Sequence, residues 1–268
     1  MNSKEIFSHF EPKRIVTIFI GCSLFASTLF SSNALATATS ATSQYQEIPN
    51  FQANFRVNLY GMDLGNSKHV FNCSSDNEDD NSNCELTTES IPKGLASWFV
   101  KDSAIETIKI QQSTDAFLWQ GYQKHIIRSK GSDKKDKLQT YQVEDNKVAY
   151  LEKALQFDWT SGLFDTTSIV YAIQWYALNQ IDINQAKLKL QSGRHQYDIT
   201  FKEQYQKSRV QLEYDRLEAE KFSFGNARYE IDLWLLPQAH YFPGKVRIHD
   251  RDEDQTLTLT LQQAPEFD

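Results

Sequence analysis

Cys73 and Cys84 are the pair of residues whose chemistry the sequence indicates most directly. Strands are expected to end near Phe71 and to begin near Leu86, so the two cysteines can face each other across a hairpin. In an oxidising compartment such a pair normally forms a disulfide, which stabilises the fold by roughly 3 kcal/mol. The alternative is a metal site that uses both thiolates and His69, but it lacks a specified fourth ligand. We predict the disulfide and no metal.

Acidic residues between the two cysteines resemble the start of a calcium-binding loop. Asp76, Glu78 and Asp80 alternate, but Asn81 stands where glycine would make the sharp turn, and Thr87 stands where the bidentate glutamate belongs. We therefore expect weak or no calcium binding. A second acidic run is expected at the solvated tip of the last hairpin: Asp250, Asp252 and Asp254.

Catalytic motifs are not found in the sequence. It contains no nucleophile elbow, no zinc-binding helix with histidine and glutamate, and no glycine loop that would cradle a phosphate. The histidines are dispersed, and no pair among the many carboxylates can be selected as acid and base. We predict no catalytic residue and no cofactor, and an uncharacterised hydrolase ranks third among the functions considered.

The first 36 residues predict export through a cleavable signal peptide. Basic residues precede an apolar run from Ile15 to Phe30, and Ala34 and Ala36 supply the small side chains of a cleavage site. Cleavage after Ala36 would leave Thr37 as the first residue. The apolar run is shorter than the roughly 20 residues of a membrane-spanning helix, so we expect a periplasmic protein that does not span the membrane once processed.

Cys22 offers a different interpretation of the same segment, in which the cysteine is acylated as in a lipoprotein. Phe19 fits poorly where such signals carry leucine, and cleavage there would leave apolar residues directly after the anchor. We therefore favour cleavage after Ala36.

The charge balance excludes nucleic acid as a partner. Lys and Arg total 28 against 35 Asp and Glu, for a formal net charge of -7. Phosphate binding requires a basic face, and the nearest candidate, the segment from Lys130 to Lys137, is interrupted by Asp133 and Asp136. A solvated turn explains that segment better.

Alternation of apolar and polar residues predicts strands over most of the chain. Phe55, Val57 and Leu59 alternate with polar residues, and Gly61 and Gly65 bracket a turn. Period-two patterns return after residue 187 and continue to the final strand, where Leu259 is expected to be buried. Two further hairpins are expected at these turns: Gly131 to Asp133 and Glu144 to Asn146.

Helical spacing predicts one main helix from Thr166 to Asn179, with Asp165 as its N-cap and an amphipathic face against the sheet. A shorter helix is expected between Pro92 and Ile105. Residues 37–50 are polar and aperiodic, which is typical of a flexible leader. We predict a single β-rich domain over residues 51–268, mainly β with one or two helices.

The C-terminal segment from Arg228 to Pro237, with Tyr241 to Pro243 and the strand from Lys245 to Ile248, resembles a proteobacterial periplasmic family catalogued as domain of unknown function 3108. Three upstream segments are similar to that family as well: Phe51 to Gly65, Gln156 to Trp159, and Asp165 to Ser168. The family resembles half-barrel lipoprotein carriers. The resemblance implies a strongly curved antiparallel sheet, a half-barrel, that wraps a helix and encloses an apolar groove.

Trp234 is the aromatic residue whose position is most informative for function. It shares a strand face with Glu230 and Asp232, while apolar residues occupy the opposite face. It either packs beneath the helix or lines a ligand groove. Our leading hypothesis is a non-enzymatic binding module for an apolar ligand, such as a lipid or the acyl chain of a lipoprotein. The alternative is a structural or interaction protein of the cell envelope with a filled core and protein partners.

Overall fold

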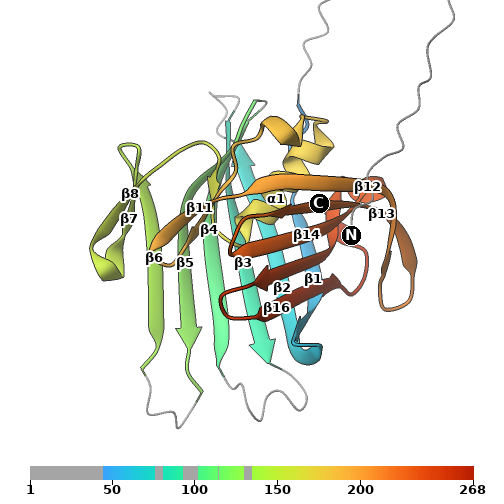
Figure 1. Ribbon diagram of the computed structural model, residues 1–268, viewed down its shortest axis with the longest axis horizontal. Helices are drawn as coiled ribbons and strands as arrows, with labels where there is room; N and C mark the ends of the chain where they lie inside the picture. The colour runs from blue at the N-terminus through green and yellow to red at the C-terminus, as the bar shows by residue number, and fades with distance from the viewer. Residues whose placement is uncertain (1–44, 76–80, 93–101, 114, 130–134) are drawn as a thin grey trace, which may run out of the picture. The chain divides into compact units, whose positions relative to one another are not determined.

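The computed structural model describes residues 45–75, 81–92, 102–113, 115–129 and 135–268 (Figure 1). These residues fold into strands with one α-helix and three short 3-10 helices. In the first part of the chain the strands are β1 (Phe51–Leu59), β2 (Met62–Ser75), β3 (Asn81–Pro92), β4 (Ser103–Ser113), β5 (Phe117–Ile127), β6 (Lys137–Glu144), β7 (Lys147–Tyr150) and β8 (Leu155–Asp158).

The second part of the chain contains the helix and the remaining strands. The strands are β9 (Leu163–Phe164), β10 (Lys189–Ser192), β11 (His195–Asp198), β12 (Thr200–Gln211), β13 (Arg216–Gly225), β14 (Tyr229–Leu236), β15 (Phe242–Asp250), β16 (Gln255–Leu261) and β17 (Glu266–Phe267). The helices are α1 (Ser168–Leu178), η2 (Leu151–Lys153), η3 (Ile183–Gln185) and η4 (Pro237–Ala239).

One large antiparallel sheet contains most of the strands. Its order is β12-β13-β14-β15-β16-β1-β2-β3-β4-β5-β6-β7-β8, with β17 paired to the start of β1. It therefore consists of two meanders, β1 to β8 and β12 to β16, joined where β1 pairs with β16. In Figure 1 the two meanders run in clearly different directions. Three short strands form a second sheet in the order β11-β10-β9. The predicted mainly β, antiparallel class is confirmed.

Two of the hairpin turns have the backbone geometry that their sequences indicate. Tyr60 and Gly61 have φ values of 52° and 77°, and Asp145 and Asn146 have values of 49° and 59°. Positive φ at both central residues of a two-residue turn defines type I′, whose twist matches that of the flanking strands. The predicted turn at residues 144–146 is confirmed. The turn predicted between Gly61 and Gly65 lies at Tyr60 and Gly61 instead, and Gly65 is part of β2.

Helix α1 begins and ends within two residues of the predicted bounds. The Asp165 carboxylate accepts hydrogen bonds from the backbone N–H groups of Thr167 and Ser168, at 2.7 and 3.0 Å, so it caps the first turn as expected. The predicted amphipathic character is wrong. Nine of the eleven residues are buried, because α1 contacts β5, β9, β15 and η3 and so presents little surface to solvent.

An aromatic cluster joins the two meanders beneath α1. The Phe51 ring lies 5.4 Å from Phe71, 5.3 Å from Tyr171 and 4.9 Å from Phe242, measured between ring centroids. These side chains come from β1, β2, α1 and β15. We call the sheet face that carries Phe51 and Phe71 the inner face. This cluster is the part of the core at which the two meanders meet, and the buried core continues from it over both meanders and α1.

Residues 45–50 are packed against the domain, so the predicted flexible leader is wrong for this part. Ile48 is 1% exposed, its N–H donates to Gln112 Oε1 at 2.9 Å, and Gln112 Nε2 donates to the Ile48 carbonyl at 3.2 Å. The Tyr45 ring lies edge-on to Trp175, with centroids 5.7 Å apart. Tertiary contacts order a segment whose composition resembles that of a flexible chain.

Several predictions fall outside the described residues. They include the signal peptide over residues 1–36, the cleavage site between Ala36 and Thr37, the calcium-like residues 76–80, the turn at 131–133 and most of the short helix expected between 92 and 105. The last three residues of that expected helix lie in β4 instead. Within the described ranges, no helix is both long enough and apolar enough to span a membrane.

Candidate functional site

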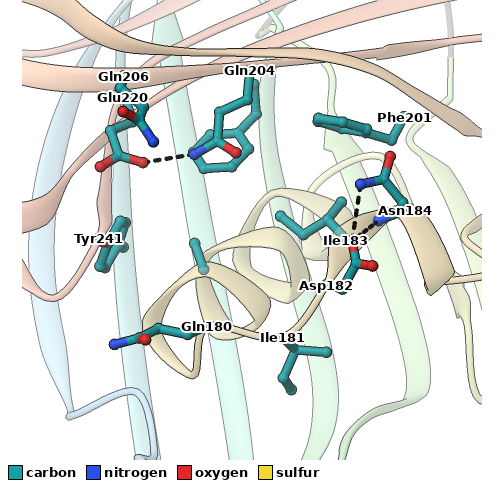
Figure 2. Close-up of a pocket in the computed structure, with 12 residues that line it drawn as sticks. Gln180, Ile181, Asp182, Ile183, Asn184, Phe201, Gln204, Gln206, Glu220 and Tyr241 are labelled. Atoms are coloured by element: carbon teal, nitrogen blue, oxygen red, sulfur yellow. Dashed lines mark hydrogen bonds between the residues drawn. The ribbon is translucent and has the colours of Figure 1, made fainter. Parts of the chain in front are cut away.

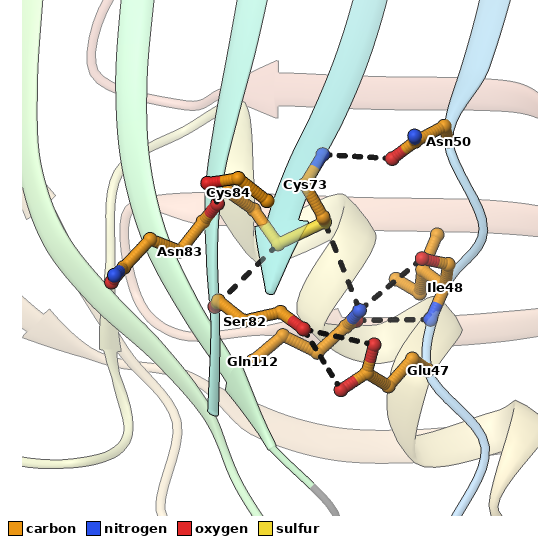
Figure 3. The surroundings of a disulfide bond; sticks show 9 residues. Glu47, Ile48, Asn50, Cys73, Ser82, Asn83, Cys84 and Gln112 are labelled. Atoms are coloured by element: carbon orange, nitrogen blue, oxygen red, sulfur yellow. Dashed lines mark hydrogen bonds between the residues drawn. A yellow bond between two sulfur atoms is a disulfide. The ribbon is translucent and has the colours of Figure 1, made fainter. Parts of the chain in front are cut away.

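The predicted disulfide between Cys73 and Cys84 is confirmed (Figure 3). The two residues lie directly opposite each other on β2 and β3. The Cys73 N–H donates to Asn50 Oδ1 at 2.7 Å, so the bridge lies beside the packed residues 45–50. With both sulfur atoms in the disulfide, neither cysteine has a thiolate that could bind a metal ion together with His69. Among the residues that the structure describes, no group of three potential ligands could hold a metal ion.

A row of polar residues crosses the inner face of the first meander. His69, Thr88, Glu106 and Lys124 lie on β2, β3, β4 and β5 and are neighbours in register. We call these four residues the polar row. Two residues away along each strand, towards the disulfide, the inner face is instead buried and apolar: Phe71, Leu86, Ile108 and Tyr122. The inner face therefore changes from apolar to polar within two residues along each of these four strands.

Glu106 is the centre of a hydrogen-bond network in this row. Its carboxylate accepts from Lys124 Nζ at 2.7 Å, from Thr167 Oγ1 at 2.8 Å and from the Tyr122 hydroxyl at 3.1 Å. The side chain is only 12% exposed. Burial alone would raise the pKa of Glu106, but the Lys124 ammonium and these hydrogen bonds outweigh it and hold the pKa below its usual range. Glu106 and Lys124 therefore form an ion pair.

His69 is a buried neutral imidazole. Its Nδ1 lies 2.6 Å from the Tyr171 hydroxyl, and its Nε2 lies 3.1 Å from Ser67 Oγ. Burial lowers the pKa of His69 to about 4, although the Glu106 charge opposes this shift. Burial has the opposite effect on Asp165 and raises the pKa of this carboxyl to about 6, against the hydrogen bonds from Ser168 and Thr167.

The polar row forms one wall of a pocket that also meets the start of α1 and the strands β15 and β16. The pocket has a volume of about 140 Å³. We call it the inner pocket; its lining residues are Phe55, His69, Glu106, Lys124, Thr166, Thr167, Val170, Tyr171, Pro243, Val246, Ile248, Leu257 and Leu259. Leu259 is half-buried because it lines this pocket, so the prediction that it is a fully buried core residue is wrong.

Trp234 lies on the opposite, outer face of the sheet. The predicted alternation is confirmed, since Tyr229, Ile231, Leu233 and Leu235 are buried on the inner face. The Trp234 ring is half-buried between the ammonium groups of Lys221 and Lys245, which lie 5.2 and 4.8 Å from its centroid. Trp234 is partly buried and packs against the hydrophobic core from this outer face, and its role in a ligand groove stays a prediction.

A second pocket lies between the segment that follows α1 and the strands β12 and β13 (Figure 2). Its volume is about 330 Å³, and amide and carboxylate side chains form much of its lining. These groups bond one another: Gln204 Nε2 donates to Glu220 at 2.8 Å, and Asn184 Nδ2 donates to Asp182 at 2.9 Å. Four of the polar side chains of this pocket are thus already paired with one another.

Sequence reasoning missed the polar row and the inner pocket. A usable signal was present, because Glu106 follows the same alternation as the apolar Ile108 and Ile110, and Lys124 follows that of Tyr122. A charged residue on an otherwise apolar strand face costs stability unless it is paired, so it marks a buried network or a site. The pairing partners come from other strands, which the sequence alone does not bring together.

Comparisons with solved structures give two distant similarities. A β-barrel-like protein of domain of unknown function DUF1849 from Brucella abortus aligns with a TM-score of 0.44 and 11% identity, over 83% of this chain and 99% of its own. MucB aligns with a TM-score of 0.30 and 10% identity, over 85% of this chain and 55% of its own. No protein-family profile and no curated protein matches the sequence. The resemblance to domain of unknown function 3108 stays a prediction.

Proposed function

We propose that this protein is an exported, non-catalytic binding module of the cell envelope that holds an apolar ligand in the inner pocket. The ligand class is an acyl chain, from a lipid or a lipoprotein. One observation carries the proposal: a contiguous set of apolar side chains on the inner face of the sheet is only half-buried. We call this set the apolar strip; it consists of Val57, Leu59, Ile248, Leu257 and Leu259.

Strand register supports the continuity of the apolar strip. Leu259 pairs with Val57, and Leu257 pairs with both Leu59 and Ile248. Three of the five residues line the inner pocket. Burial of apolar surface contributes about 25 cal/mol per Å². A bound chain that covered the half-buried side chains of the apolar strip would therefore bind with a favourable free energy.

Volume limits how much of a ligand the inner pocket encloses. Its roughly 140 Å³ is close to the size of an engineered cavity that holds a benzene ring, so it accepts on the order of six carbon atoms. Complete ligand sites are usually about 300 to 1,000 Å³. We therefore propose that one chain end enters the inner pocket and that the rest of the chain follows the apolar strip.

Export and sheet curvature are part of the same proposal. The Cys73–Cys84 disulfide supports an oxidising compartment, and the predicted signal peptide supports the periplasm. The different directions of the two meanders in Figure 1 support a sheet that curves around α1 as a half-barrel. Such curvature would bring β15 and β16 opposite the polar row, as the lining of the inner pocket requires.

Two other functions are less well supported. An interaction protein with a filled core would not need half-buried apolar neighbours around a pocket. A hydrolase would need an accessible nucleophile, whereas Ser67, which bonds His69, is 3% exposed and accepts a second hydrogen bond from Ser90 at 3.0 Å. The polar side chains in the wall of the inner pocket already form hydrogen bonds with one another, which favours a structural role for them over a catalytic one.

Titration with N-phenyl-1-naphthylamine, an uncharged apolar fluorophore, tests the proposal on the processed protein. We expect saturable binding by the wild type, weakened at least tenfold in Leu259→Asn because an amide would enter the apolar strip. Thr258→Asn is the matched control, since Thr258 is the adjacent residue on the outer face. Absence of probe binding by the folded wild type would favour the interaction protein instead.

A further inference from the structure

We infer that the inner pocket selects uncharged acyl esters and amides over free fatty acids. The inference builds on the proposed function and specifies the chemical class of its ligand. It follows from the charges that the wall of the pocket already holds and from the hydrogen-bond donors that this wall leaves for a ligand.

The charged groups of the wall compensate one another without a ligand. Lys124 Nζ lies 2.7 Å from Glu106, and the imidazole of His69 is neutral. Asp165 is not among the lining residues of the inner pocket, but it is 2% exposed at the start of α1 and interacts electrostatically with Glu106. The charges that line the inner pocket therefore already sum to zero, and a ligand carboxylate would add an uncompensated negative charge beside Glu106 in a poorly solvated place.

Hydrogen-bond capacity at the wall suits a carbonyl oxygen. Lys124 is 31% exposed, lines the inner pocket and has three N–H donors, of which one reaches Glu106. Thr166 brings a hydroxyl to the same wall. An ester or amide carbonyl accepts from such donors without changing the charge of the site, while its alkyl chain lies against Leu257 and Leu259.

A free carboxylate could accept from the same spare donors of Lys124, but its negative charge would compete with Glu106 for the positive charge of Lys124. If the ligand carboxylate drew Lys124 away, Glu106, which is 12% exposed, would keep only its hydrogen bonds from the neutral hydroxyls of Thr167 and Tyr122. Removing the charged partner from a buried carboxylate is costly. We expect at least a tenfold preference for the uncharged ligand.

Displacement of bound N-phenyl-1-naphthylamine by methyl octanoate, octanamide and octanoate at pH 8 tests the inference. We expect the ester and the amide to displace the probe at concentrations at least tenfold lower than octanoate. In Glu106→Gln, where Lys124 has lost its charged partner, the preference should fall below threefold. Glu89→Gln is the control, because Glu89 lies on the exposed side of β3.

The outcomes separate the two proposals. Equal or tighter binding of octanoate by the wild type would overturn the inference and leave the binding function intact. A bound probe that none of the three ligands displaces would overturn both the inference and the acyl-chain class of the proposed ligand. A wild type that binds no probe would overturn the proposed function itself. The wild-type comparison is decisive even if Glu106→Gln does not fold.

Discussion

Two buried titratable groups near the start of α1 should act on stability in opposite directions between pH 4 and pH 6.5. His69 is 4% exposed and Asp165 is 2% exposed, so solvent screens neither strongly. Burial favours the neutral form of both, but the neutral form is the deprotonated one for His69 and the protonated one for Asp165. Their contributions to the free energy of unfolding therefore have opposite signs.

The magnitudes follow from the pKa shifts. The pKa of His69 falls from 6.5 to about 4 on folding, so about 3 kcal/mol of stability, present above pH 6.5, is lost as the pH falls through 4. The pKa of Asp165 rises from 3.8 to about 6, so about 3 kcal/mol, present below pH 3.8, is lost as the pH rises through 6. We predict that these two effects nearly cancel in the wild type.

Single substitutions should reveal each contribution in urea unfolding measured from pH 4 to pH 7. Asp165→Asn retains the His69 effect, so its stability should fall by about 3 kcal/mol as the pH is lowered. His69→Gln retains the Asp165 effect and should gain a similar amount over the same range. His195→Gln, at an exposed position, is the control. Asp165→Asn and wild-type profiles of the same slope would refute the reasoning.

Three further predictions concern the pocket, the disulfide and processing. Leu259→Ala should lower the free energy of unfolding by less than the roughly 2 to 5 kcal/mol typical of a fully buried leucine. Leu233→Ala, at a position that is 0% exposed, should fall within that range. Equal losses of stability in the two variants, measured by urea unfolding, would contradict a half-buried Leu259. Replacing both Cys73 and Cys84 by serine should lower stability by about 3 kcal/mol without unfolding the domain, and intact masses of the wild type with and without reductant should differ by two hydrogens. N-terminal sequencing of the exported protein should begin at Thr37, whereas a lipid-modified Cys22 would contradict this.

Local patterns in the sequence predicted the features that depend on neighbouring residues. Alternation identified the strands, Asp165 marked the start of α1, and the cysteines were placed across a hairpin, because each signal lies within a few residues. The amphipathic assignment of α1 failed for a related reason. Its spacing gave an apolar face, but only the fold determines that β9 and η3 contact the helix in addition to the strands β5 and β15 of the large sheet.

Features that depend on distant residues were not predictable in this way. The polar row combines residues from four strands, and only their register brings Glu106 beside Lys124. Ile48 is ordered by Gln112, 64 residues away, although its own segment has the composition of a flexible leader. Half-burial of Leu259 depends on a pocket whose other walls come from α1 and the first meander.

The pairing of β1 with β16 has a consequence for folding. Each meander can form from contacts between strands that are close in sequence, but their union requires residues about 200 positions apart, as in the pair Phe55 and Leu261. Before this union both β1 and β16 would present unpaired edges and an uncovered apolar face, which are the features that promote aggregation. A chain of this design is therefore most vulnerable in the interval before its last long strand joins its first, and this interval is when a chaperone would be most useful.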